Sequence, residues 1–108
     1  MSERLAAIAG EYGLQFSKIS APQFTKYQES HFIAPHRDTR AAYPERVFSA
    51  VTYLTENYEG GEIEFPTIRR RFHPRQGETL VFPAEMLHAV RPVEAGEKQI
   101  FLFFIDRN

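Results

Sequence analysis

The sequence predicts a mainly β fold, and two observations support this prediction. Ten Phe and five Tyr stand among the 108 residues, and both residue types favour strands. From residue 14 onward, short runs rich in Val, Ile, Phe, Tyr and Thr alternate with turn residues. So many short strands in about ninety residues favour a sandwich, a jelly roll or a barrel. The expected strands lie near residues 14–19, 23–28, 31–36, 46–55, 61–66, 69–74, 78–83, 88–93 and 98–106.

Only the start of the chain has a helical period. Its apolar residues recur at i, i+3, i+4 and i+7 and form one face, made of Leu5, Ile8, Ala9 and Tyr12. Ser2 suits the N-cap of such a helix and Gly13 suits its end. We therefore expect one domain over residues 1–108, with a short helix over 1–13 and the β fold over 14–108.

Two of the expected strands are apolar almost throughout. They are RVFSAVTYLT, at 46–55, and QIFLFFI, at 99–105. Such runs are typical of strands that are buried on both faces, so we place them in the middle of a sheet. Gly60 and Gly61 are interpreted as a turn that needs positive φ.

Composition excludes several classes of function. Thirteen basic and fourteen acidic residues give a formal charge of -1, so no global field attracts nucleic acid or an anionic membrane. The absence of cysteine excludes disulfides, thiolate nucleophiles and Cys-ligated metal sites. No apolar run is long enough for a signal peptide or a membrane span, so we expect a cytoplasmic protein.

One set of residues has the chemistry of a metal site. His36 and Asp38 belong to an HRD triplet, and residues i and i+2 of an extended segment point to the same side. His88, at the head of the strand-like segment HAVRPV, is the best candidate for a third ligand. Two His and one carboxylate, with three coordination positions open, form the facial triad of non-haem Fe(II) oxygenases.

Other interpretations of these residues stay open at this point. An isolated HxD is common, and most such pairs lie in solvated turns. HRD also opens the protein-kinase catalytic loop, but here no Gly-rich loop precedes it and the expected downstream Asn is missing. The remaining histidines, His31 and His73, are interpreted as surface or strand residues, with His31 as the alternative to one of the three ligands.

The run Arg69, Arg70 and Arg71 is the only cluster of like charge. We interpret it as an exposed edge strand that its charges protect from pairing with other chains. The alternative is a patch at the rim of the site that steers an acidic or peptide substrate. Glu62 and Glu64 are the nearest acidic residues that can pair with it.

Four segments together resemble the 2-oxoglutarate- and Fe(II)-dependent oxygenases of the prolyl 4-hydroxylase type. They stand in the family's order and cover some three quarters of the chain, from near Phe24 to about Phe104. The segments are FTKYQESHFIAPHRDT, RVFSAVTYLTENYEGGEIEF, PRQGETLVFP and HAVRPVEAGEKQIFLFF. This resemblance implies a double-stranded β-helix, which is a jelly roll, behind one short N-terminal helix.

The resemblance also implies a role for each matching residue. The three predicted ligands match the family's iron ligands. Lys98, ten positions after the distal His, matches the basic residue that binds the distal carboxylate of 2-oxoglutarate. Tyr53 stands where a hydroxyl helps to bind that carboxylate, and Tyr27 where a Tyr lies near the co-substrate's iron-binding end. The alternative for either Tyr is an aromatic side chain packed in the core. Because 2-oxoglutarate is a dianion, a buried site for it needs a cation and hydroxyl donors.

The activity that the resemblance implies is an Fe(II)- and 2-oxoglutarate-dependent dioxygenase. It would hydroxylate a peptide or small-molecule substrate with O2 and release succinate and CO2. Prolyl peptides are the family's best-known substrates, but nothing in this sequence specifies proline.

The family usually has a longer N-terminal helical layer, so we expect a trimmed core, a minimal relative or a homodimer. The alternative from another class is a non-catalytic jelly-roll domain that binds a metal or a small anion. A cupin-type metalloenzyme would add a third His and a Glu, and the tight spacing of its second His is missing here.

Overall fold

The computed structural model describes residues 16–39 and 44–107, and antiparallel strands build this part of the chain. The predicted helix over 1–13 lies outside the described residues. Within them the single helical element is a 3-10 turn. The described residues contain no helix that is long and apolar enough to cross a membrane. The elements are β1 (Phe16–Ile19), β2 (Gln23–Tyr27), β3 (Ile33–His36), β4 (Arg46–Tyr53), β5 (Glu59–Gly60), β6 (Ile63–Phe65), η1 (Pro66–Ile68), β7 (Arg70–Phe72), β8 (Thr79–Pro83), β9 (His88–Val90), β10 (Val93–Ala95) and β11 (Lys98–Arg107).

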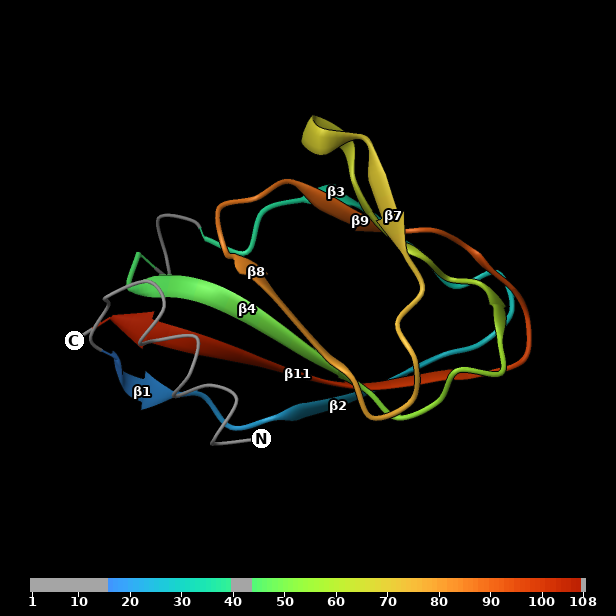
Figure 1. Cartoon of the computed structure of the whole chain (residues 1–108), viewed down its shortest axis with the longest axis horizontal. Coiled ribbons are helices and arrows are strands. Elements are labelled where there is room, and N and C mark those ends of the chain that lie inside the picture. Colours follow the sequence, from blue (N-terminus) through green and yellow to red (C-terminus); the bar gives the residue numbers. More distant parts are fainter. Residues whose placement is uncertain (1–15, 40–43, 108) are drawn as a thin grey trace.

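Two antiparallel sheets face each other (Figure 1). In the larger sheet, β11 pairs with β1 and β2 along one edge and with β4 along the other, and β4 also pairs with β8. The smaller sheet has the order β3-β9-β6-β7, and β5 and β10 form a separate short ribbon. Two packed antiparallel sheets of this kind form a jelly-roll-like fold, so the mainly β prediction is confirmed.

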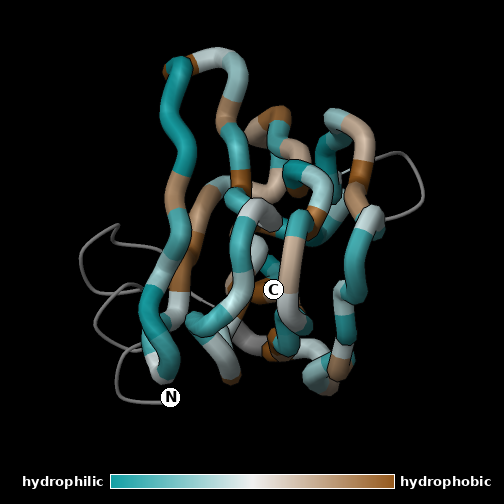
Figure 2. The backbone as a smooth tube through the Cα atoms, turned by 90° about the vertical axis from the view of Figure 1, so that its right-hand side faces the viewer, coloured by the Kyte–Doolittle hydropathy of each residue, from teal (hydrophilic) through white to brown (hydrophobic). Residues whose placement is uncertain are grey.

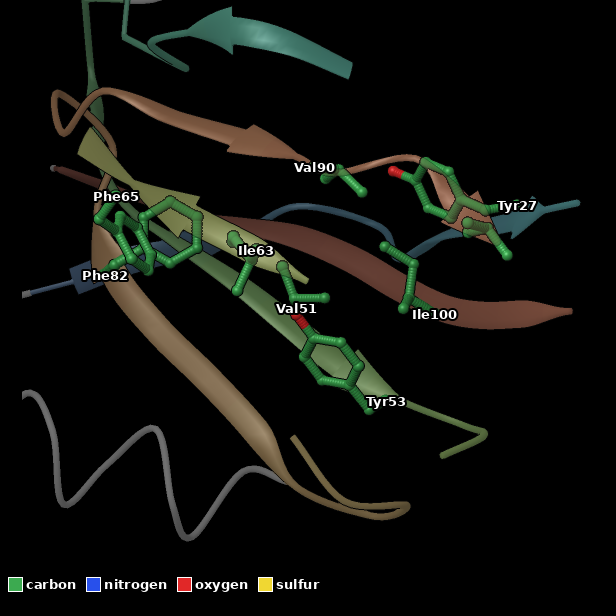
Figure 3. Packing of buried hydrophobic residues seen from close by; sticks show 9 residues of the cluster. Tyr27, Val51, Tyr53, Ile63, Phe65, Phe82, Val90 and Ile100 are labelled. Carbon is green, nitrogen blue, oxygen red and sulfur yellow. The ribbon is translucent and has the colours of Figure 1, made fainter. Parts of the chain in front are cut away.

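Strands β4 and β11 occupy the centre of the larger sheet because both of their faces are apolar. One face contributes Val51 and Ile100 to a core between the sheets, where they join Ile63 of β6 (Figure 3). The other face carries a second cluster, made of Phe48, Ala50, Phe103 and Ile105. Burial of each large apolar side chain contributes about 1.5–3 kcal/mol, so strands with two apolar faces are favoured in the middle of the sheet.

The double glycine forms the predicted turn. Gly60 and Gly61 have φ of 72° and 66°, which is the left-handed region that glycine adopts without strain. A Cβ on Gly60 would lie 2.4 Å from the carbonyl oxygen of Pro92, so a side chain does not fit there. This close approach lets β5 pair with β10 and leaves Gly61 buried beside the core.

The predicted strands are present, with two differences in the connections between them. The expected strand over 88–93 is divided: β9 ends at Val90 and β10 begins at Val93, because Pro92 has no N–H to donate to a ladder. Strand β5 was not predicted, since two residues are too few to display a period, and β10 extends beyond the expected strand to Ala95. In Figure 2 hydrophobic stretches of the tube are interrupted by hydrophilic ones, in keeping with the short apolar runs and turn residues that predicted the strands.

The arginine run lies at an edge, as predicted. Strand β7 is the last strand of the smaller sheet, and it includes Arg70 and Arg71. Arg71 forms an ion pair with Glu64 of β6 at 2.6 Å, so that part of the pairing prediction is confirmed. Arg69 precedes the strand with a φ of 53° and closes η1 through its N–H to Pro66.

Candidate functional site

The three predicted metal ligands lie side by side at the ends of two neighbouring strands. His36 ends β3 and His88 begins β9, and the antiparallel register places them directly opposite each other. Asp38 follows two residues later, where its backbone N–H donates to the carbonyl of Ala84 at 2.8 Å. One ligand atom from each of the three residues lies within 4.8 Å of the others, the one such group in the described ranges.

Both imidazoles are oriented by the backbone. Nδ1 of His36 donates to the carbonyl of Ala34, and Nδ1 of His88 donates to that of Met86, both at 2.9 Å. Because a carbonyl oxygen only accepts, the proton of each neutral ring is on Nδ1 and the lone pair is on Nε2. The two Nε2 atoms lie 3.3 and 3.4 Å from the carboxylate oxygens Oδ1 and Oδ2 of Asp38.

This group of atoms fits a divalent cation. Imidazole nitrogens and carboxylate oxygens are all acceptors when the rings are neutral, so they attract a cation placed among them. Burial lowers the pKa of His88, which favours its neutral, metal-binding form. Two ligands at about 2.1 Å from one ion and at right angles to each other are about 3 Å apart. The separation of 3.3 Å between Nε2 of His36 and Oδ1 of Asp38 is close to that value.

Ser49 also belongs to the site, although the sequence did not predict it. It is fully buried on β4, and its Oγ donates to Oδ2 of Asp38 at 2.5 Å. Ser49 shares the inner face of β4 with Val51 and Tyr53, which lie two and four residues further along. A polar residue in step with two inward apolar residues is the pattern that could have identified it.

Lys98 points into the space between the sheets. It begins β11, is only 1% exposed, and its Nζ donates to the carbonyl of Gly61 at 2.8 Å. No carboxylate of the described residues forms an ion pair with it. Burial lowers the pKa of Lys98 to about 8, while the more distant charge of Glu62 acts in the opposite direction. A buried ammonium without a counter-ion is the feature expected of an anion-binding residue.

Three tyrosine rings surround this ammonium. Nζ lies 4.9 Å from the ring centroid of Tyr27, 5.4 Å from that of Tyr53 and 5.9 Å from that of Tyr58. Tyr27 stands directly opposite Lys98 in the register, and Tyr53 stands opposite Ile100, two residues further along β11. Tyr58 was not predicted, because a single Tyr in the loop between β4 and β5 has no distinguishing pattern.

The tyrosine hydroxyls stay protonated and can donate. Burial raises the pKa of Tyr27 to about 12 and also raises that of Tyr53. In Figure 3 both hydroxyls point into the interior between the sheets. Both rings also pack in the inner core, as the alternative interpretation of these two residues expected. Their hydroxyls are still candidate donors.

A single cavity connects the two groups. It has a volume of about 50 Å3, and its lining includes the triad, Lys98, Tyr27 and Tyr53. Apolar side chains complete its walls, among them Val51, Ile63, Val90, Ile100 and Leu102. One water needs about 10–15 Å3 by a comparable measure, so the cavity holds a few water-sized groups. Metal ligands and a buried cation in one apolar cavity fit a metal with an anionic co-substrate.

The other two histidines lie apart from this group. Nδ1 of His31 accepts from the backbone N–H of Gln28 at 3.0 Å. His73 stacks on Tyr58 with ring centroids 4.3 Å apart, and its Nε2 donates to the carbonyl of the same residue. Both are exposed, which agrees with the prediction that they are surface or strand residues.

Comparison with known proteins identifies one family. Residues 22–106 match the model of the 2OG-Fe(II) oxygenase superfamily. A PKHD-type hydroxylase of Klebsiella pneumoniae is 33% identical over 97 residues, which cover 81% of this chain and 43% of the relative. The chain spans 42–50% of the length of the curated relatives that it matches.

Solved structures share the fold. An oxidoreductase of the 2OG-Fe(II) oxygenase family from Burkholderia pseudomallei has a TM-score of 0.83 and 28% identity, and the match covers 97% of this chain and 52% of that one. The viral collagen prolyl hydroxylase of Paramecium Bursaria Chlorella virus-1, in complex with 2OG, has a TM-score of 0.83 and 24% identity. That match covers 99% of this chain and 70% of the viral one, and it shows the likeness of the fold.

Proposed function

The chain belongs to the 2OG-Fe(II) oxygenase superfamily, and from this premise we propose that it carries the catalytic site of an Fe(II)- and 2-oxoglutarate-dependent dioxygenase. The observation that carries the proposal is the content of the inner cavity. At one place three ligand atoms converge within 4.8 Å, and the same cavity contains a lysine that is 1% exposed and has no ion pair with the described residues.

In this proposal His36, Asp38 and His88 bind Fe(II). The backbone hydrogen bonds of the two imidazoles fix their tautomers and aim both Nε2 atoms at one point. When bound, Fe(II) would supply the oxidation of a substrate C–H bond to C–OH by O2, coupled to the conversion of 2-oxoglutarate into succinate and CO2. Three protein ligands leave room on a six-coordinate ion for the co-substrate and O2.

Lys98, Tyr53 and Tyr27 would bind 2-oxoglutarate. The ammonium of Lys98 would pair with the distal carboxylate, which replaces the hydration that both ions lose on burial. Tyr53, whose hydroxyl stays protonated, would donate to the same carboxylate, and Tyr27 would donate nearer to the metal. The apolar walls between these residues exclude bulk water, which strengthens each of these interactions.

The primary substrate that we propose is a peptide, with proline as the residue that is hydroxylated. Two findings support this choice. Relatives of the chain include PKHD-type hydroxylases, and one similar structure is a collagen prolyl hydroxylase. The product would carry one oxygen atom of O2 and succinate the other, with one CO2 released for each hydroxyl formed. The homodimer and the cytoplasmic location remain predictions.

Succinate formation tests the proposal directly. The protein is loaded with Fe(II) without O2, then exposed to O2 and 2-oxoglutarate, alone and with a proline-rich peptide, and succinate is measured. We expect succinate well above that of a His36→Ala control, and more of it with the peptide. Succinate at the control level would contradict the dioxygenase. Binding of 2-oxoglutarate without its consumption would favour a non-catalytic binding domain.

A further inference from the structure

The hydrogen bond between Ser49 and Asp38 is the shortest polar contact of the candidate metal site. Oγ of Ser49 lies 2.5 Å from Oδ2 of Asp38, in the range of a hydroxyl that donates to an ionised carboxylate. Ser49 is completely buried and Asp38 is 7% exposed, so water does not replace this bond easily. The contact joins β4 of the larger sheet to the segment that follows β3 of the smaller one.

We propose that Ser49 is a positioning residue that keeps Asp38 a monodentate metal ligand. This inference rests on the proposed function. A carboxylate has two oxygens that can both bind one ion. Oδ2 lies 3.4 Å from Nε2 of His88 but accepts the Ser49 hydroxyl, which uses one of its lone pairs, so we assign Oδ1 to the metal. Oδ1 lies 3.3 Å from Nε2 of His36, which is a suitable separation for two ligands of the same ion.

The consequence concerns the number of open coordination positions. A six-coordinate ion with three protein ligand atoms keeps three positions for other molecules, whereas a bidentate Asp38 would leave two. A chelating 2-oxoglutarate and O2 together need three. The hydroxyl of Ser49 would therefore decide whether co-substrate and O2 bind at the same time, although Ser49 itself contacts neither.

Ser49 is the residue of β4 whose side chain donates to the carboxylate of Asp38. The inner face of β4 continues with Val51 and Tyr53, and Val51 has no donor. Thr52 is on the opposite face and pairs its hydroxyl with that of Thr79 at 2.9 Å. Thr52→Val is therefore a matched control, because it removes a hydroxyl from the same strand without touching Asp38.

Co(II) binding to the whole chain tests the inference without any turnover. Ser49→Thr and Ser49→Val have the same shape and differ only in the hydroxyl, so any strain from the added bulk is common to both. We expect the Thr variant to bind Co(II) about 10–100-fold more tightly than the Val variant, since loss of a group that orients a ligand typically costs that much affinity. We also expect the visible Co(II) spectrum of the Val variant to differ from that of the wild type, and the Thr variant to restore it.

Equal Co(II) affinity and equal spectra for the Thr and Val variants would overturn the inference. Ser49→Ala provides a second comparison, which adds no bulk and should bind Co(II) about 10–100-fold more weakly than Thr52→Val. An effect of Thr52→Val as large as that of Ser49→Ala would also overturn it. If the wild type binds Co(II) no better than His36→Ala, the proposed metal site itself fails, which is a different outcome from equal binding among the Ser49 variants.

Discussion

The two ends of the inner cavity differ in the charge that they attract. At the triad end, two imidazole nitrogens and a carboxylate gather acceptors within 4.8 Å, an arrangement that favours a cation. At the other end, Lys98 places a buried ammonium among three tyrosine rings, an arrangement that favours an anion. Each arrangement by itself is costly, because a buried charged or lone-pair group without its partner loses hydration without compensation.

The two ends therefore depend on different ligands, a cation at the triad end and an anion at the Lys98 end. Both ends border the same cavity and the same apolar core, so a substitution that disturbs this core would affect the two ends alike. A substitution that acts through the site chemistry should affect one end and leave the other intact. Metal affinity and 2-oxoglutarate affinity, measured separately, therefore distinguish a functional role from a structural one.

Asp38→Ala should have the largest effect, and only at the triad end. Removal of the carboxylate deletes a ligand, so we expect Co(II) or Fe(II) affinity to fall by at least about 100-fold, beyond the loss that an orienting residue alone causes. Succinate formation should fall to background. Equilibrium metal titration measures the effect. Glu64→Gln is the control, because it removes a carboxylate of the smaller sheet that pairs with Arg71. Wild-type metal affinity in Asp38→Ala would remove the basis for this end of the site.

Lys98→Met should have the opposite pattern. Metal affinity should stay near that of the wild type, while 2-oxoglutarate binding weakens by about 100-fold, because loss of a buried charge partner costs about 2–5 kcal/mol. The metal- and ligand-free variant should be at least as stable as the wild type, since an apolar side chain replaces a buried ammonium that has no ion pair with the described residues. Calorimetric titration and thermal unfolding measure both quantities. A loss of stability without a loss of co-substrate affinity would mean that Lys98 is purely structural.

Titration of Lys98 should make both protein stability and 2-oxoglutarate binding depend on pH. Its pKa is about 8 in the folded protein, against about 10.4 when unfolded, so between these values the folded state binds fewer protons. The free energy of unfolding should therefore rise with pH from about 8 to about 10, as the cost of the buried charge disappears. The Kd for 2-oxoglutarate should rise over the same range, by up to about tenfold per pH unit, because the dianion needs the charged lysine.

Chemical denaturation and 2-oxoglutarate titration at several pH values above and below 8 test this coupling. The Lys98→Met variant is the control, since its curves should lack the Lys98 contribution to both trends. A Kd that is constant across this range in the wild type would show that the proton on Lys98 does not participate in binding.

The sequence predicted the parts of the site that depend on local pattern. His36 and Asp38 are two residues apart near the end of a strand, and this spacing is visible in the chain itself. His88 and Lys98 were found through their spacing of ten residues and the resemblance that it supports. The central position of β4 and β11 was predicted from their apolar runs, because strands that are buried on both faces lie in the middle of a sheet.

The parts that the sequence did not predict depend on pairing across the fold. Ser49 contacts Asp38 only because β4 and the end of β3 belong to facing sheets, eleven residues apart along the chain. The carbonyl of Gly61 reaches Lys98 because a tight glycine turn lies against β10 and β11, thirty-seven residues away. Such contacts have no periodic pattern, so only the three-dimensional register reveals them.

Tyr53→Phe should have the smallest effect, and it tests how the anion-binding end works. If the hydroxyl donates to the co-substrate, its loss should weaken 2-oxoglutarate binding by about fivefold, the equivalent of one hydrogen bond of about 1 kcal/mol. Tyr58→Phe is the matched comparison. The Tyr58 hydroxyl is buried and has no partner among the described residues, and it does not line the cavity, so we expect its removal to change binding by less than about twofold. Equal effects of the two variants would mean that the rings around Lys98, and not a specific hydroxyl, determine the affinity for the anion.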